Sequence, residues 1–433
     1  MGLTITDPNA TFEHYVRLNP TANFDFLSST VDTIAGRSLT TDRASVASYI
    51  GADGLVHSAA AGVPRLDHHP TTLAPRGLLV EAAATNVLAE SEDVGAWVLL
   101  VTGGATANVT VTAGARQGPD GELSLAKVSE TSANSAHYIR SGYVPMTAPS
   151  GYVTDSRFVA AGERTRIEYG LSQTGSVTTN VLAEINLETG EVISISGGTG
   201  TARTKWYEAC QCWRIEITAP AAPGMTGVRA AIALRDGAGN SSYVGVAGSG
   251  IYMGAMQLED GARATSYIKT AGAAGARAVD NIYLDGSALA AVVGDAGGAL
   301  VAHGEAGIVT AVAGTRTIAA LTDDDGDDSN SVWLGRSTTN RPFGAVNDAV
   351  SADPTRTWAG NVLGVGLAYA ANDHLFAVDG TRRAIVGAQP LIAPERLQVG
   401  ARFAGVDVWG GWVRDLSVYA IRPADIALAL ATT

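Results

Sequence analysis

Cysteine, charged residues, aromatic residues and long apolar runs are all scarce in this 433-residue sequence. Only 16% of the residues are charged, which argues against a protein built of long exposed helices, because such helices are rich in Glu, Lys and Arg. The chain has no window of about 18 apolar residues, the length needed for a membrane-spanning helix. The first 20 residues have neither a basic start nor an apolar core, so the sequence predicts no secretory signal peptide.

The two cysteines, Cys210 and Cys212, lie two positions apart. On a strand this spacing places both side chains on one face, but neighbours so close do not easily reach disulfide geometry. We therefore expect two reduced, packed thiols. A metal pair is the alternative, although no second Cys or His pair supplies the remaining ligands.

The charge balance is acidic, with 42 acidic and 29 basic residues and a net charge of −13. An acidic surface repels phosphate backbones, so nucleic acid is excluded as an expected partner. The same balance argues against docking on an anionic membrane or polymer through long-range electrostatic attraction. It permits recognition of neutral sugars, which depends on ring stacking and hydrogen bonds.

Short strand-like runs separated by turn residues dominate the chain, which contains 51 glycines. Runs of five to eight residues recur without helical faces between them, a pattern typical of antiparallel β-sandwiches. We therefore expect an all-β protein. The exception is the C-terminal run RPADIALALA, where Pro423 and the following apolar spacing predict one short helix.

The stretch from Pro64 to Trp97, PRLDHHPTTLAPRGLLVEAAATNVLAESEDVGAW, includes a short apolar run, Leu78 to Val80, that predicts a buried strand. Its sequence resembles the junction ahead of the jelly-roll modules in tailed-phage and gene-transfer-agent fibre or head-spike proteins. The segment 249–280, SGIYMGAMQLEDGARATSYIKTAGAAGARAVD, resembles the last strand and exit of their carbohydrate-binding-like jelly roll. Met253, Met256 and Lys269 depart from the usual pattern at core and linker positions.

The C-terminal part resembles the laminin-G or concanavalin-like sandwich that follows the jelly roll in such fibres. The matching positions are Tyr369, Asn372, Asp373, Val378, Asp379, Gly380, Arg396, Leu397, Val399, Gly400, Arg402, Arg414 and Asp415. The resemblance implies two tandem sandwiches, jelly roll at 85–277 and laminin-G-like at 278–433, after an attachment and connector region at 1–84. Residues 1–40 either dock on the particle or form a plain strand pair.

The resemblance also implies a function and a set of partners. We expect a virion fibre or head-spike protein, made in the bacterial cytoplasm and displayed on the particle surface, that binds capsular or other host-surface polysaccharide. Its partners would be that glycan and a capsid or spike-base protein. Single sugar sites are weak and are often multiplied, so we expect a homo-oligomer, first of all a trimer. The alternatives are a ligand-free decoration protein and a glycan-cleaving spike.

No catalytic motif supports an enzyme. The sequence contains no HExxH, GxSxG or GxxxxGK[ST] pattern, and no E-x-D-x-x-E strand. Glu184 and Glu188 have a spacing that could place two carboxylates about 5 to 10 Å apart, as glycoside hydrolysis requires. We nevertheless expect a non-enzymatic protein without a cofactor.

The acidic loop Asp323, Asp325 and Asp327 is the candidate metal site. Calcium takes six to eight oxygen ligands, and clustered carboxylates on a loop bent at Gly326 can supply several. The spacing does not match an EF-hand. A solvated hairpin loop is the alternative, so calcium stays a weak expectation.

The sugar-binding candidates combine aromatic rings with planar polar groups. Aromatics make up only 6% of the chain, so their positions are informative. Polar residues lie near Trp358 in the sequence, and a glycine-rich turn precedes Trp206. The candidates are Trp358, Arg356, Asn361, Asn340, Arg341, Trp206 and Tyr207. The alternative for each ring is packing in a sandwich, which we expect for Trp97, Trp213 and Trp333.

Overall fold

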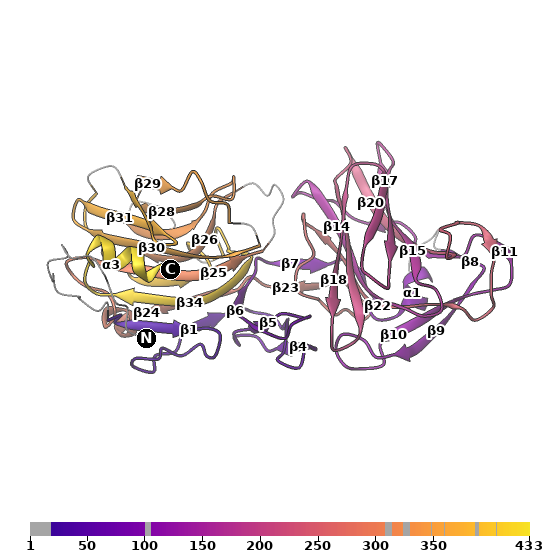
Figure 1. Ribbon diagram of the computed structural model, residues 1–433, viewed down its shortest axis with the longest axis horizontal. Helices are drawn as coiled ribbons and strands as arrows, with labels where there is room; N and C mark the ends of the chain where they lie inside the picture. The colour runs from indigo at the N-terminus through magenta and orange to yellow at the C-terminus, as the bar shows by residue number, and fades with distance from the viewer. Residues whose placement is uncertain are drawn as a thin grey trace, which may run out of the picture.

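The chain folds into two β-sandwiches that lie side by side along its long axis (Figure 1). The computed structural model describes residues 19–99, 105–307, 314–323, 330–347, 349–358, 360–385, 389–403 and 405–433. The all-β class and the two antiparallel sandwiches are confirmed. Within these residues there are three short helices: α1 (Val94–Leu99), α2 (Gly286–Ala290) and α3 (Asp425–Ala431). Helix α3 confirms the predicted C-terminal helix.

The inserted sandwich, residues 84–277, has two main sheets. In order, the first, called the β15 sheet, contains β17 (Val192–Gly197), β16 (Thr179–Asn186), β15 (Arg166–Gly175), β20 (Met225–Arg235), β12 (Tyr138–Arg140) and β8 (Ala105–Ala107), with β13 (Val144–Pro145) also on β20. The second, the β14 sheet, contains β18 (Thr201–Tyr207), β19 (Cys212–Pro220), β14 (Tyr152–Ala161), β22 (Gly250–Asp260), β10 (Leu125–Glu130) and β9 (Val109–Arg116). A small ladder joins β11 (Asn134–Ser135) to β21 (Tyr243–Val244). Alternate residues such as Ile167, Leu171 and Val159 face inward and form the core, as strand periodicity requires.

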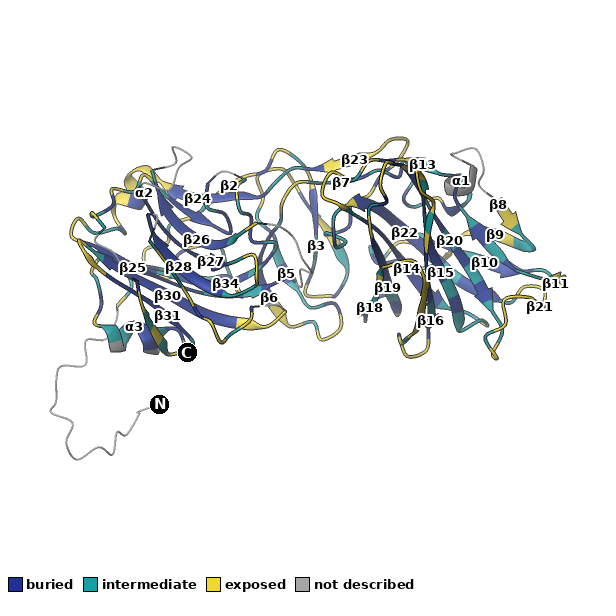
Figure 2. Cartoon of the chain, turned by 90° about the horizontal axis from the view of Figure 1, so that it is seen from above, coloured by how far each residue is buried: buried dark blue, intermediate teal, exposed yellow. Residues whose placement is uncertain are grey.

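The second sandwich, called the split sandwich, is built from both ends of the chain. One sheet contains β32 (Thr381–Ala384), β31 (Asp373–Val378), β30 (Val362–Ala370), β25 (Gly298–Ala306), β34 (Gly411–Tyr419), β6 (Pro75–Val80) and β5 (Leu66–His68), with β1 (Ala22–Asp25) also on β34. The other contains β2 (Thr40–Asp42), β24 (Asn281–Asp285), β33 (Arg396–Val399), β26 (Arg316–Thr322), β27 (Ser331–Arg336), β28 (Pro342–Val346) and β29 (Ala349–Ala352). Figure 2 shows buried residues concentrated in the strands of both sandwiches and exposed residues mainly in the turns.

The N-terminal region is not a separate unit, which corrects the expected division at residue 84. Strands β1, β5 and β6 join one sheet of the split sandwich and β2 joins the other. Phe24 and Phe26 are fully buried in its core. The predicted buried strand at Leu78 to Val80 is β6, and it pairs with β34. The expected N-terminal strand pair does not form among the described residues, because β1 pairs with β34 and β2 pairs with β24.

The inserted sandwich interrupts the split sandwich, because segments of the split sandwich precede and follow it in the chain. Its entry strand β7 (Ala84–Asn86) and its exit strand β23 (Gly275–Arg277) pair with each other at the junction (Figure 1). The hairpin of β3 (Ala47–Ile50) and β4 (Val56–Ala59) turns at Gly54, whose φ of 79° is the left-handed conformation that an Asp-Gly pair favours. Ile50 and Val56 of this hairpin pack on the outer face of the β14 sheet, against a cluster that includes Phe158.

A buried ionic network fastens this junction. Asp280 accepts hydrogen bonds from Arg43 (2.9 Å) and from Arg65. Arg65 also donates to Glu81 (2.8 Å), and Arg277 lies 3.6 Å from the same carboxylate. Arg43, Arg65 and Glu81 precede the insertion, Arg277 is its last residue and Asp280 follows it, so the network ties its two ends together. No helix among the described residues is long and apolar enough to cross a membrane.

Candidate functional site

The outer face of the β15 sheet carries the best-defined polar surface of the inserted sandwich. Inward residues of β20, such as Val228 and Ile232, belong to the core, so Arg229 and its alternate neighbours point away from it. On β12, Ile139 is buried whereas Tyr138 and Arg140 are partly exposed. Strand alternation therefore gathers arginine and tyrosine side chains on one open face.

Four side chains define what we call the arginine–tyrosine face: Tyr138, Arg140, Tyr143 and Arg229. The guanidinium carbon of Arg229 lies 4.5 Å from the ring centroid of Tyr143, and that of Arg140 lies 5.7 Å from the centroid of Tyr138. Arg140 is directly opposite Ala231, two residues from Arg229. Register thus places the two arginines as diagonal neighbours, which side chains of this length can bridge.

The two arginines differ from the others on the same sheet. Arg166 pairs with Glu184 at 2.7 Å, and Arg235 pairs with Glu168. Within the described part of the chain, neither Arg140 nor Arg229 forms an ion pair. Their guanidinium groups therefore keep donors for a ligand, while stacking on tyrosine holds them in place.

Small residues occupy the middle of the face. Gly170 lies opposite Ala231, and Ala233 lies between Glu168 and Tyr138 across the strands. A Cβ on Gly170 would approach the Leu182 side chain to 3.0 Å, so Leu182 extends over that glycine. The result is a low apolar centre bordered by tyrosine rings and guanidinium groups. Sugars are recognised by this combination, because their C–H faces stack on rings and their oxygens accept hydrogen bonds.

Trp358 does not serve as an exposed platform, which corrects the leading sequence-based candidate. Its side chain is fully buried, its Nε1 donates to the Gly304 carbonyl at 3.1 Å, and its ring packs edge-on against Trp409 at 4.6 Å. The polar sequence around it misled the prediction, because the loop folds back and inserts the indole into the core of the split sandwich. Trp333 is buried against Phe343, as expected.

The polar neighbours of Trp358 have structural partners. Arg356 donates to Asp353 at 2.9 Å and to Thr381 at 3.0 Å. Asn340 has a left-handed φ of 58° and accepts a hydrogen bond from Arg336 at 2.8 Å. The Arg341 guanidinium donates to the carbonyl of Pro354, and Asn361 is exposed. With Trp358 buried, these residues do not surround an open ring.

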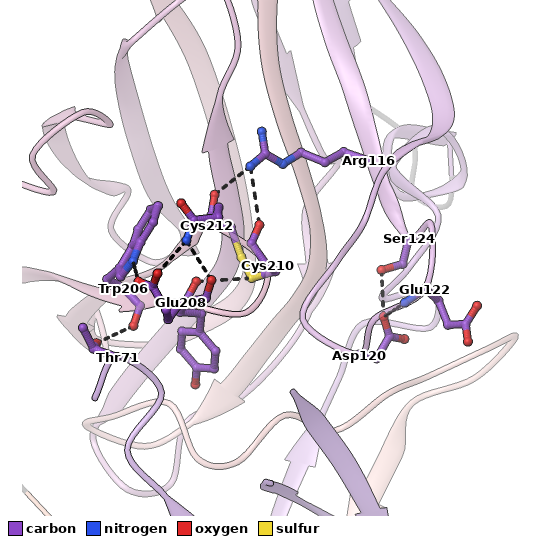
Figure 3. Close-up of a disulfide and its surroundings, with 11 residues drawn as sticks. Thr71, Arg116, Asp120, Glu122, Ser124, Trp206, Glu208, Cys210 and Cys212 are labelled. Atoms are coloured by element: carbon purple, nitrogen blue, oxygen red, sulfur yellow. Dashed lines mark hydrogen bonds between the residues drawn. A yellow bond between two sulfur atoms is a disulfide. The ribbon is translucent and has the colours of Figure 1, made fainter. Parts of the chain in front are cut away.

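The second predicted pair separates into one buried and one partly exposed ring. Tyr207 is 5% exposed and packs edge-on against Phe158, so it is a core residue of the β14 sheet's outer cluster. Trp206 is partly exposed, lies 4.9 Å from Trp213 and donates from Nε1 to Glu208 at 2.7 Å (Figure 3). Trp206 therefore stays a predicted sugar contact, without Tyr207 as its neighbour.

Cys210 and Cys212 form a disulfide, so the expectation of two free thiols is wrong (Figure 3). The prediction assumed that both residues lie on one strand. Cys210 instead lies in the turn before β19, and Gln211 between them has a left-handed φ of 51°, which brings the two Cα atoms to 5.4 Å. The Arg116 guanidinium donates a hydrogen bond to the carbonyl of Gln211 at 2.9 Å and so connects this turn to β9.

The structure supplies no support for a metal site in the residues that it describes. Asp325 and Asp327 lie outside them, and Asp323 accepts a hydrogen bond from Asn330 at 2.9 Å. No group of three or more potential ligands comes together elsewhere in the described chain.

Sequence reasoning missed the arginine–tyrosine face. The signal was present as the alternating runs Tyr138-Ile-Arg140 and Arg229-Ala-Ala-Ile-Ala-Leu-Arg235, in which every second residue is apolar and buried. Only the strand order, β15-β20-β12, shows that the two runs are neighbours.

Comparisons with known proteins identify only distant similarities. No family and no curated protein matches the sequence. A Ruminococcus gnavus IT-sialidase CBM40 structure aligns with 35% of this chain and 93% of its own, at 13% identity and a TM-score of 0.30. Mouse laminin alpha1 domains LG4-5 align with 74% of this chain and 89% of their own, at 10% identity and a TM-score of 0.20. A Trypanosoma rangeli sialidase aligns with 71% and 60%, at 12% identity and 0.26. At these values no functional residue is transferred.

Proposed function

We propose that this chain is a non-enzymatic glycan-binding protein on the surface of a phage-like particle, and that the arginine–tyrosine face contacts the glycan. The observation that carries the proposal is that Arg140 and Arg229 have no ion-pair partner among the described residues, although both are stacked on tyrosines. A guanidinium fork binds carboxylate or hydroxyl oxygens, and the adjacent rings accept the face of a sugar.

The local chemistry refines the expected ligand. The chain as a whole is acidic, with a net charge of −13, so a polymer with many negative charges would be repelled at long range. The two arginines make this face locally basic. We therefore propose a host-surface polysaccharide of low charge density, in which occasional acidic units alternate with neutral ones.

The particle role rests on the sequence resemblance in residues 45–97 and at the ends of the two modules. We propose attachment to a capsid or spike-base protein and a homo-oligomer, a trimer first of all, because several weak sites on one particle raise the total affinity. The disulfide is compatible with display outside the reducing cytoplasm, where such bonds persist.

A binding assay tests the proposal directly. The purified chain would be added to host cells with and without their capsule, beside an Arg140→Ala/Arg229→Ala variant. Arg382→Ala is the control, because Arg382 is exposed on β32 of the other sandwich. We expect capsule-dependent binding that the double variant loses by tenfold or more and the control keeps. Equal binding to both cell types would refute the glycan role and favour a decoration protein.

The glycan-cleaving alternative has one structural observation in its favour. Glu168 and Glu184 are directly opposite each other on β15 and β16. Each carboxylate is already paired with an arginine, Glu168 with Arg235 and Glu184 with Arg166, so its oxygens are engaged within the sheet. Glu188 lies in the turn after β16 rather than beside Glu184 on the strand. Release of oligosaccharides from capsule, abolished by Glu168→Gln, would overturn the non-enzymatic assignment.

A further inference from the structure

A second polar site lies between the two sandwiches. Here β18 and β19 of the inserted sandwich face β6, β26 and β34 of the split sandwich across a cleft of about 630 Å³. This volume is within the range of small-molecule sites, roughly 300 to 1,000 Å³. We call it the inter-sandwich cleft. It is formed by the opposite sheet of the inserted sandwich from the one that carries the arginine–tyrosine face.

The carboxylates that line the cleft are already satisfied. Glu305 accepts from Arg76 (Nε at 3.2 Å), and Glu216 pairs with Arg263 at 2.8 Å. Asp67 accepts from the indole Nε1 of Trp412 at 2.7 Å. Glu81 belongs to the buried network, and Asp260 accepts from the backbone and hydroxyl of Ser150. Glu305, Glu216 and Glu81 are thus each paired with an arginine, whereas Asp67 and Asp260 accept hydrogen bonds from neutral donors.

Two basic side chains in the lining lack such partners. Lys205 projects from β18 and Arg316 from β26, so they come from different sandwiches. In the part of the chain that the structure describes, neither forms an ion pair or a side-chain hydrogen bond. Both are largely withdrawn from solvent, and burial lowers the pKa of each, for Lys205 to about 8. An unpaired cation in such a place is costly, and a bound anion would offset that cost.

Aromatic groups complete the lining. The Arg76 guanidinium lies over the Trp412 ring, 3.0 Å from its centroid, and the Glu305 carboxylate fixes it there. Tyr49 and Tyr152 also line the cleft and are partly exposed. Phenol groups supply both a ring and a hydroxyl, the two kinds of contact that a sugar uses.

We propose that the inter-sandwich cleft binds one saccharide unit that carries an oxyanion, with Lys205 and Arg316 as the groups that neutralise its charge. The anion follows from the unpaired cations of the cleft alone. The saccharide class rests on the proposed function. The oxyanion is a carboxylate, sulfate or phosphate substituent, because each offers the oxygens that ammonium and guanidinium groups bind.

The test is a titration of the purified chain with each of four probes, in which calorimetry or ligand-observed NMR measures binding. The probes are methyl β-glucuronide, galactose 6-sulfate, methyl β-glucoside and inorganic sulfate. We expect binding of at least one acidic sugar, no binding of the neutral glucoside, and weaker binding of sulfate alone. Lys205→Ala and Arg316→Ala should each weaken the acidic sugar about tenfold, as loss of a hydrogen bond to a charged group does. Arg382→Ala should have no effect.

The pH dependence provides a second readout. The charged groups near Lys205 are Arg76, Glu305, Asp67 and Arg263. Lys205 loses its proton as the pH rises through about 8, so affinity should fall between pH 7 and pH 9.5. The Lys205→Arg variant should bind with little change over this range, because guanidinium keeps its proton.

The outcomes separate this site from the first one. The Arg140→Ala/Arg229→Ala variant should keep its affinity for the acidic sugar in the cleft, even if it no longer binds cells. Equal affinity for sulfate and for the sugars would overturn the saccharide assignment. Absence of binding by every probe, or binding that Lys205→Ala and Arg316→Ala leave unchanged while their melting temperatures match the wild type, would overturn the site.

Discussion

Arg43 and Asp280 are 237 residues apart in the sequence and form a fully buried ion pair of 2.9 Å. Arg43 also donates to the carbonyls of Ala60 (2.8 Å) and Val63 (2.9 Å), so one guanidinium holds the N-terminal connector against the exit of the insertion. Asp280 receives Arg65 and the Glu81 backbone N–H as well. This carboxylate is therefore the common acceptor at which both ends of the inserted sandwich meet.

Removal of that carboxylate should destabilise the protein strongly. Asp280→Asn keeps the shape but leaves Arg43 and Arg65 without their shared negative charge in a buried site. Loss of one partner of a buried pair costs about 3 to 5 kcal/mol, which should lower the denaturation midpoint clearly. Asp42→Asn, at an exposed position of β2, is the matched control and should have little effect. Equal midpoints for Asp280→Asn and the wild type would show that the network contributes nothing to stability.

The same network should make the free energy of unfolding depend on pH in the acidic range. Burial by itself would raise the pKa of Glu81, but Arg277 and Arg65, with hydrogen bonds from Ser266, lower it to about 2. In the unfolded chain the value is about 4.5, so the unfolded state takes up the proton first. The contribution of Glu81 is complete above pH 4.5 and is lost as the pH falls from there to about 2.

Urea unfolding at a series of pH values measures this effect. The wild type should lose stability on the order of 3 kcal/mol from this group over that window. The Glu81→Gln variant should be less stable at neutral pH and should show a shallower decline in acid. A decline of the same slope in both proteins would assign the acid sensitivity to other carboxylates.

The disulfide should contribute only modestly to stability. It closes a loop of three residues, for which the chain-entropy estimate is roughly 1 to 2 kcal/mol. Cys210→Ala/Cys212→Ala should therefore fold with a slightly lower melting temperature. Alkylation of the denatured protein without reductant should leave both cysteines unlabelled, and reduction beforehand should label both. Labelling of both thiols without reductant would contradict the bond.

Local structure was largely predictable from the sequence. Leu78 to Val80 read as a buried strand because three consecutive apolar residues follow Pro75, and they form part of β6. The Asp53-Gly54 pair favours a hairpin turn because glycine adopts positive φ without strain, and the hairpin of β3 and β4 turns there. The C-terminal apolar spacing after Pro423 read as a helix, and α3 is there. In each case the cause is steric or periodic and acts within a few residues.

The site could not be predicted in the same way. Trp358 has polar neighbours in sequence, yet its loop turns inward and buries the indole against Trp409. Arg140 and Arg229 are 89 residues apart and come together only because β12 pairs with β20. Lys205 and Arg316 line one cleft only because the inserted sandwich lies against the split one.

The sequence by itself determined the all-β class, the turns and the C-terminal helix, since composition and residue periodicity act locally. The tertiary structure alone decided that the N-terminal strands complete the C-terminal sandwich, that Cys210 and Cys212 are bonded, and which arginine and lysine side chains have no ion-pair partner among the described residues. Strand pairing between distant segments and burial of individual side chains depend on the free energy of the whole fold, so no short stretch of sequence carries them.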